Sequence, residues 1–80
     1  MIIPKLGGDY FVIIKSKAST GQILNLEGAL YLEGDDFYES VLGLKAAENR
    51  AEFLMENELN IEVSIHDGNG EFVKIYREVI

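Results

Sequence analysis

The stretch IEVSIHDGNGEFVKIYREV, residues 61–79, decides the fold. Apolar and polar residues alternate from Ile61 to His66, which is the pattern of a strand with one buried face. Residues 67–70 are rich in turn-forming types, and an alternating, β-branched and aromatic run follows them. These features predict an antiparallel β-hairpin.

The length of the connecting loop sets the register of this hairpin. A two- or four-residue loop would place Val63 opposite Lys74, whereas a three-residue loop pairs apolar side chains with each other. We therefore expect a type I turn followed by a bulge, with Gly70 in the left-handed conformation. The expected pairs are Ile65 with Val73, Val63 with Ile75, His66 with Phe72, Ser64 with Lys74, and Glu62 with Tyr76.

A helix is predicted immediately before the hairpin, from Leu44 to about Asn57. Its apolar residues recur at the spacing of one helical face, namely Leu44, Ala47, Ala51, Leu54 and Met55. Asp36 and Glu39 have the spacing of a capping box, which predicts a short helical turn over residues 37–42. Gly43 then separates that turn from the main helix.

The N-terminal half of the chain adds strands to the sheet. Residues 10–17, YFVIIKSK, predict a strand buried on both faces. Leucines alternate over residues 22–33, which predicts either one strand bent at Gly28 or two short strands. The whole chain, residues 1–80, is thus expected to be a single α+β domain. Its antiparallel sheet has four or five strands in the order β-β-(β)-α-β-β, with the main helix on one face.

Length and composition narrow the function. Eighty residues with 48% hydrophobic content suit one folded domain. The chain has no cysteine, so disulfides, thiolate zinc sites and cysteine nucleophiles are excluded. The first residues lack the pattern of a signal peptide, and the apolar runs are too short for a membrane span. A cytoplasmic location is therefore expected.

The charge of the chain is concentrated in its middle. The net charge is −7, and residues 27–71 hold twelve acidic residues against only Lys45 and Arg50. Nucleic acids and anionic membranes bind cationic surfaces, so neither is expected as a direct partner. A protein with a basic surface is the better electrostatic match.

Two groups of side chains are candidates for partner binding. The first is an acidic stripe on the main helix, Glu48, Glu52 and Glu56, extended by Asp35, Asp36 and Glu39. Like charges four residues apart destabilise a helix slightly, so such a stripe is either an ordinary solvated face or a surface kept for a partner. Helix capping alone would also explain the acids at 35, 36 and 39.

The second group is the face of the sheet that the helix leaves open. It is predicted to carry Tyr31, Phe72 and Tyr76, together with either Phe11 and Ile13 or Tyr10 and Val12. Exposed apolar patches often mark interfaces, so a homodimer through this face or through an edge strand is expected. The alternative is that loops and the N-terminal arm cover the face.

No residue pattern indicates an active site or a cofactor. His66 could act with Ser64 or Lys74, and the acids at 33–39 could hold a metal, but neither spacing is diagnostic. The sequence therefore favours a non-enzymatic acidic protein-binding module without a cofactor. One concrete form is an inhibitor that mimics nucleic acid on a basic surface, by analogy with small phage or mobile-element anti-defence proteins. A ligand-binding or enzymatic domain with a pocket completed by dimerisation, and a structural or assembly subunit, are the alternatives.

Overall fold

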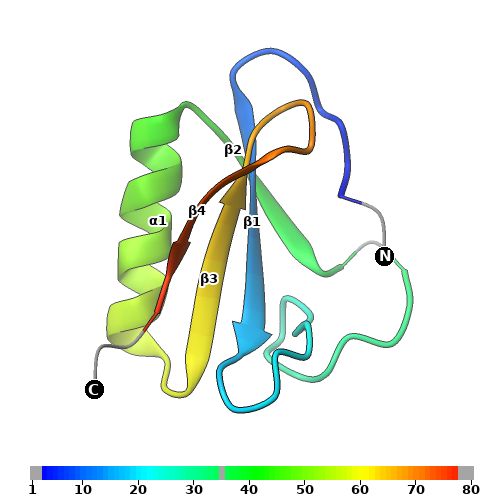
Figure 1. Ribbon diagram of the computed structural model, residues 1–80, viewed down its shortest axis with the longest axis vertical. Helices are drawn as coiled ribbons and strands as arrows, with labels where there is room; N and C mark the ends of the chain where they lie inside the picture. The colour runs from blue at the N-terminus through cyan, green and yellow to red at the C-terminus, as the bar shows by residue number, and fades with distance from the viewer. Residues whose placement is uncertain (1–2, 35, 78–80) are drawn as a thin grey trace.

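The computed structural model describes residues 3–34 and 36–77. Within them the chain forms β1 (Tyr10–Lys17), β2 (Tyr38–Leu42), α1 (Leu44–Asn57), β3 (Ile61–His66) and β4 (Phe72–Tyr76), as Figure 1 shows. The strands lie in the order β2-β1-β3-β4, and every neighbouring pair is antiparallel. The predicted fold class, an antiparallel sheet of four strands with one helix in the order β-β-α-β-β, is confirmed.

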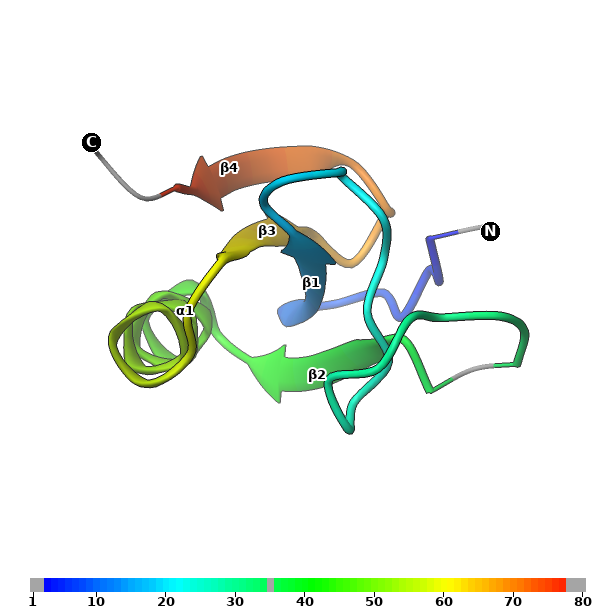
Figure 2. The same cartoon turned by 90° about the horizontal axis from the view of Figure 1, so that it is seen from below.

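The main core lies between α1 and the sheet, as the end-on view of the helix in Figure 2 illustrates. Ala47 and Ala51 are fully buried, and these small side chains let the helix approach the strands closely. They meet Ile13, Val63 and Ile65, which the β1–β3 register places on the same side of the sheet. The helix was predicted from the spacing of its apolar residues, and that spacing directs Ala47, Ala51 and Leu54 into this core. Leu44, at the start of the predicted apolar face, is instead exposed.

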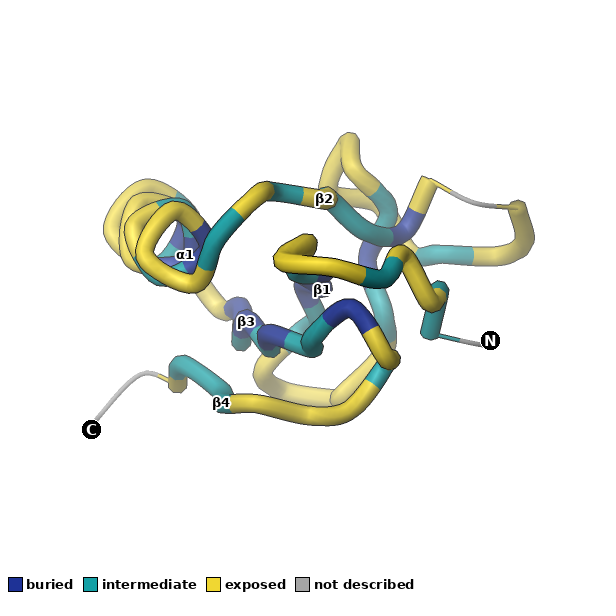
Figure 3. Tube along the Cα trace, turned by 90° about the horizontal axis from the view of Figure 1, so that it is seen from above, coloured by how far each residue is buried: buried dark blue, intermediate teal, exposed yellow. Residues whose placement is uncertain are grey.

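A second, smaller core lies on the opposite side of the sheet. Val12 and Ile14 are buried there with Phe37, and Ile3, Ile23, Tyr31 and Tyr38 pack around them. The expectation of a bare face is therefore wrong over β1, because Ile3, Ile23, Tyr31 and Phe37 cover it. Figure 3 shows the consequence: buried positions gather in the central strands and on one side of α1.

The strand predicted within residues 22–33 is wrong. This segment is a loop with only two isolated bridges, Ser16 with Ile23 and Leu24 with Leu30. The Asn25 side chain closes a turn, since its Oδ1 accepts hydrogen bonds from the backbone N–H groups of Glu27 and Ala29, both at 3.0 Å. Local side-chain hydrogen bonds of this kind compete with strand pairing.

The helical turn predicted over residues 37–42 is also wrong, because this segment forms β2. Its pairing with β1 places Ile13 opposite Glu39 and Phe11 opposite Val41. The bonds of an edge strand to β1 outweigh the local capping signal of Asp36 and Glu39. Helix α1 then begins after Gly43, which has a φ of 94° and provides no side-chain cap.

The hairpin of β3 and β4 has the predicted turn, with Gly70 at a φ of 82°. The pair His66–Phe72 is as predicted, but a bulge follows and Ile65 faces Lys74 instead of Val73. One extra residue in a strand reverses the sides of all later residues. Tyr76 therefore packs on the α1 side of the sheet, and its predicted place on the opposite face is wrong.

We predict that Ile65→Ala lowers the free energy of unfolding by about 2–5 kcal/mol, because it leaves a cavity beneath α1. Leu32→Ala is the matched control, since Leu32 is 89% exposed, and it should change stability by less than about 0.5 kcal/mol. Urea unfolding followed by circular dichroism measures both variants. Equal effects of the two substitutions would contradict the assignment of this core.

Candidate protein-binding surface

The predicted acidic stripe on α1 divides into two parts. Glu48 lies beside β4, where its Oε2 is 3.1 Å from the Nζ of Lys74. Glu52 and Glu56 are exposed, and neither forms an ion pair with any residue in the described part of the chain. Only these two glutamates of the stripe are thus left without a counter-ion.

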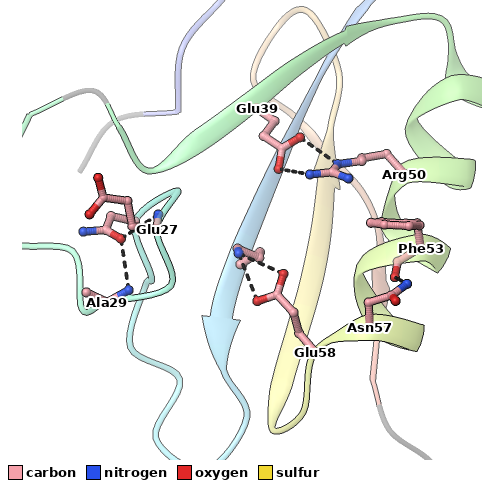
Figure 4. A network of polar contacts seen from close by, with 9 residues as sticks. Glu27, Ala29, Glu39, Arg50, Phe53, Asn57 and Glu58 are labelled. Carbon is pink, nitrogen blue, oxygen red and sulfur yellow. Dashed lines mark hydrogen bonds and ion pairs between the residues drawn. The ribbon is translucent and has the colours of Figure 1, made fainter.

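The predicted extension of the stripe towards β2 does not form. Glu39 binds Arg50 through two contacts, Nε to Oε1 at 2.8 Å and Nη2 to Oε2 at 3.1 Å (Figure 4). This hydrogen-bonded carboxylate is the main reason why the pKa of Arg50 is raised. Asp36 is exposed in the segment before β2, which Figures 1 and 2 place away from α1. Asp35 lies outside the described residues.

An aromatic side chain that the sequence did not single out lies beside the two free glutamates. Phe53 is 52% exposed on the outer side of α1, and the guanidinium carbon of Arg50 lies 5.2 Å from its ring centroid. Glu56 lies four positions after Glu52 and three after Phe53, so its side chain neighbours both of theirs on the exposed part of the helix. We call Glu52, Phe53 and Glu56 the outer helix surface. Its signal in the sequence was a phenylalanine off the apolar face of the helix.

Ion pairing within the molecule leaves a mainly acidic exterior. Residues 3–34 and 36–77 form four ion pairs with one another, which join Lys15 to Glu58, Arg50 to Glu39, Lys74 to Glu48 and Arg77 to Glu62. These pairs use four of the seven basic residues of the chain. Among the described acids, those without an ion pair are Asp9, Glu27, Glu33, Asp36, Glu52, Glu56, Asp67 and Glu71.

The three predicted aromatic residues do not form one patch. Tyr31 packs edge-on against Phe37 with ring centroids 5.0 Å apart, and its hydroxyl donates to the Gly34 carbonyl. Tyr76 lies on the α1 side, and its hydroxyl oxygen is buried without a hydrogen-bond partner. Phe72 alone is largely exposed, at 61%, on edge strand β4. Self-association through an edge strand stays a prediction.

Of the candidate catalytic residues, His66 and Ser64 lie close together, but Lys74 does not join them. Nε2 of His66 lies 3.2 Å from Oγ of Ser64, on the side of the sheet opposite α1. Nδ1 of His66 is buried without a partner to orient the ring, and Lys74 lies on the other side with Glu48. A hydroxyl nucleophile needs a base held in place by a third group, which this pair lacks. In the described ranges no three metal-ligating side chains cluster as a metal site.

We predict that protonation of His66 destabilises the fold. Burial lowers its pKa below the ordinary 6.5, so the unfolded chain binds this proton more readily than the folded chain. Stability should therefore fall as the pH drops below about 6.5. Urea unfolding at pH 7.5 and at pH 5 should show a larger loss for the natural protein than for His66→Gln. Parallel pH profiles of the two proteins would show that His66 does not contribute.

The described part of the chain contains no helix with the length and apolar character needed to cross a bilayer. No protein-family model, curated protein or solved structure compared with this chain matches it.

Proposed function

We propose that this protein is a non-enzymatic binding module whose outer helix surface docks on a basic surface of another protein. The observation that carries the proposal is the exposure of Glu52 and Glu56, which have no counter-ion among the described residues, beside the half-exposed ring of Phe53. Other acids near α1, Glu39 and Glu48, are bound to basic residues of the same chain. The two free carboxylates are available to ion-pair with a partner.

The residues around Glu52 and Glu56 indicate that the outer helix surface is already formed before a partner binds. Arg50 is fixed by both oxygens of Glu39, and its guanidinium packs on the ring of Phe53. An aromatic side chain held in one orientation loses little conformational entropy when a partner covers it. Aromatic residues near the centre of an interface often supply much of the binding energy, while charges around them steer association.

An inhibitor is the form of this function that we favour. The outer helix surface would cover the nucleic-acid groove of a basic partner, with Glu52 and Glu56 in the place of backbone phosphates. Small size and strong negative charge support this analogy. Such a complex should compete with nucleic acid and weaken as salt rises.

We predict that Glu52→Lys with Glu56→Lys lowers affinity for the partner at least about tenfold, because two attractive charges become repulsive. The matched control is Glu27→Lys with Glu33→Lys, which changes the net charge equally at exposed acids of the loop before β2. Immobilised protein would be incubated with lysate of its native host, and bound proteins quantified. The control variant should capture as much partner as the natural protein does. Added duplex DNA should release the partner from the immobilised natural protein.

Phe53→Ala separates the apolar contribution from the electrostatic one. It should weaken capture at every salt concentration, whereas the double lysine variant should reduce the loss of capture between about 0.1 M and about 1 M salt. Equal capture by the double lysine variant and the natural protein would refute the proposed surface. Capture that DNA fails to displace would refute the inhibitor form alone.

A further inference from the structure

A cavity of about 360 Å³ opens between the loop before β2 and the turn that follows α1. Its apolar lining includes Leu24, Leu30, Leu59 and Ile61. Leu24 and Ile61 also belong to the main core, so the floor of the cavity is continuous with the packed interior. Leu59 is 88% exposed at its rim and is free to cover a bound molecule. The volume is at the lower end of the range for small-ligand sites, about 300–1,000 Å³.

Both walls of the cavity are held by backbone hydrogen bonds. On the loop side, Leu24 N–H donates to the Lys15 carbonyl at 2.9 Å, and Asn25 N–H donates to the Ala29 carbonyl at 2.7 Å. On the other side, Glu58 N–H donates to the Leu54 carbonyl at 3.0 Å. Ala18 N–H donates to the Asn60 carbonyl at 2.9 Å and ties that turn to the end of β1. The site is thus formed before any ligand arrives, which lowers the entropy cost of binding.

The charges around the cavity favour an anion despite the negative charge of the chain. Lys17 lines the cavity and has no ion pair with any residue of the described ranges. Glu58 also lines it, but both of its oxygens lie 3.1 Å from Nζ of Lys15, a residue only 7% exposed. That pair cancels the charge of Glu58 and leaves the Lys17 ammonium in excess. In Figure 4 the carboxylate of Glu27 points away from Glu58.

We propose that this cavity binds a small apolar monocarboxylate. The carboxylate pairs with the Lys17 ammonium, and the apolar body packs on Leu24, Leu30 and Leu59. A carboxylate forms a stronger hydrogen bond with the Lys17 ammonium than a neutral group does, so the cavity should bind the acid more tightly than a neutral molecule of the same shape. This site is separate from the outer helix surface, so either proposal can fail without the other.

The test is a nuclear magnetic resonance titration of the ¹⁵N-labelled full chain with hexanoate and with hexanamide, its neutral analogue. Hexanoate should cause saturable shifts at the amides of Leu30 and Leu59, with a Kd of about 1 mM or lower. Hexanamide should bind at least about tenfold more weakly, because its carbonyl can accept a hydrogen bond from the ammonium but has no negative charge to form an ion pair.

Lys17→Gln should weaken hexanoate binding at least about tenfold, and Lys45→Gln should leave it unchanged. Lys45 is the matched control because it too lacks an ion pair in the described chain, yet lies on α1 away from the cavity lining. Unchanged shifts elsewhere in the spectrum show that each variant is folded. Non-saturable shifts, equal binding of hexanamide, or equal binding by Lys17→Gln would overturn the proposal. Shifts at Leu59 that grow with protein concentration alone would assign the cavity to a second copy of the chain and overturn it too.

Discussion

The burial of β1 on both of its faces is the constraint on which the rest of the structure depends. Val12, Ile13 and Ile14 are consecutive, so they point to alternate sides of the sheet, and all three are buried. The chain has one long helix, and a helix can cover only one side. The other side must be covered by irregular chain, and Ile23, Tyr31 and Phe37 from the segment between β1 and β2 do so. This division accounts for the long loop, for the second core around Phe37, and for the cavity beside Leu30.

The position of α1 is fixed from both sides by ion pairs. Arg50 reaches Glu39 on edge strand β2, and Glu48 accepts a hydrogen bond from Lys74 on edge strand β4. Partly exposed pairs contribute little stability, because solvent screens their attraction. The buried face of α1, which carries Ala47, Ala51 and Leu54, determines which side of the helix faces outward, and the two ion pairs join its flanks to the edge strands. The bulge in β4 is necessary for this arrangement, because without it Lys74 would lie on the opposite side of the sheet. The edge strands thus neutralise Glu39 and Glu48, and Glu52 and Glu56 are left without an ion pair among the described residues.

The sequence predicted the elements whose signal is local and periodic. The alternation in β3, the helical spacing in α1 and the β-branched run in β1 were each recognised, because buried positions repeat at the period of the element. Strand β2 was not predicted, because its extended conformation depends on pairing with β1. The spacing of Asp36 and Glu39 is instead typical of the start of a helix. Leucines alternated over residues 22–33 as in a strand, but Leu26 and Leu32 are exposed and the Asn25 turn decides the conformation.

The candidate surface was predictable only in part. The spacing of Glu52 and Glu56 on one helix stripe follows from the sequence, but the pairing of Glu48 and Glu39 depends on contacts between distant segments. The bond between Lys15 and Glu58 joins residues 43 positions apart, so no local pattern could indicate it. Phe53 lies off the predicted apolar face, but its contact with Arg50 depends on the folded orientation of α1.

Site-specific photo-crosslinking in the native host tests the central claim most directly. A photoreactive phenylalanine analogue would replace Phe53 in one variant and Phe72, which is similarly exposed, in the other. If a basic partner docks on the outer helix surface, the analogue at position 53 should form a discrete adduct with that protein, and the adduct should disappear at high salt. The analogue at position 72 should form no adduct with it. An adduct from position 72 alone, or no adduct from position 53, would contradict the account.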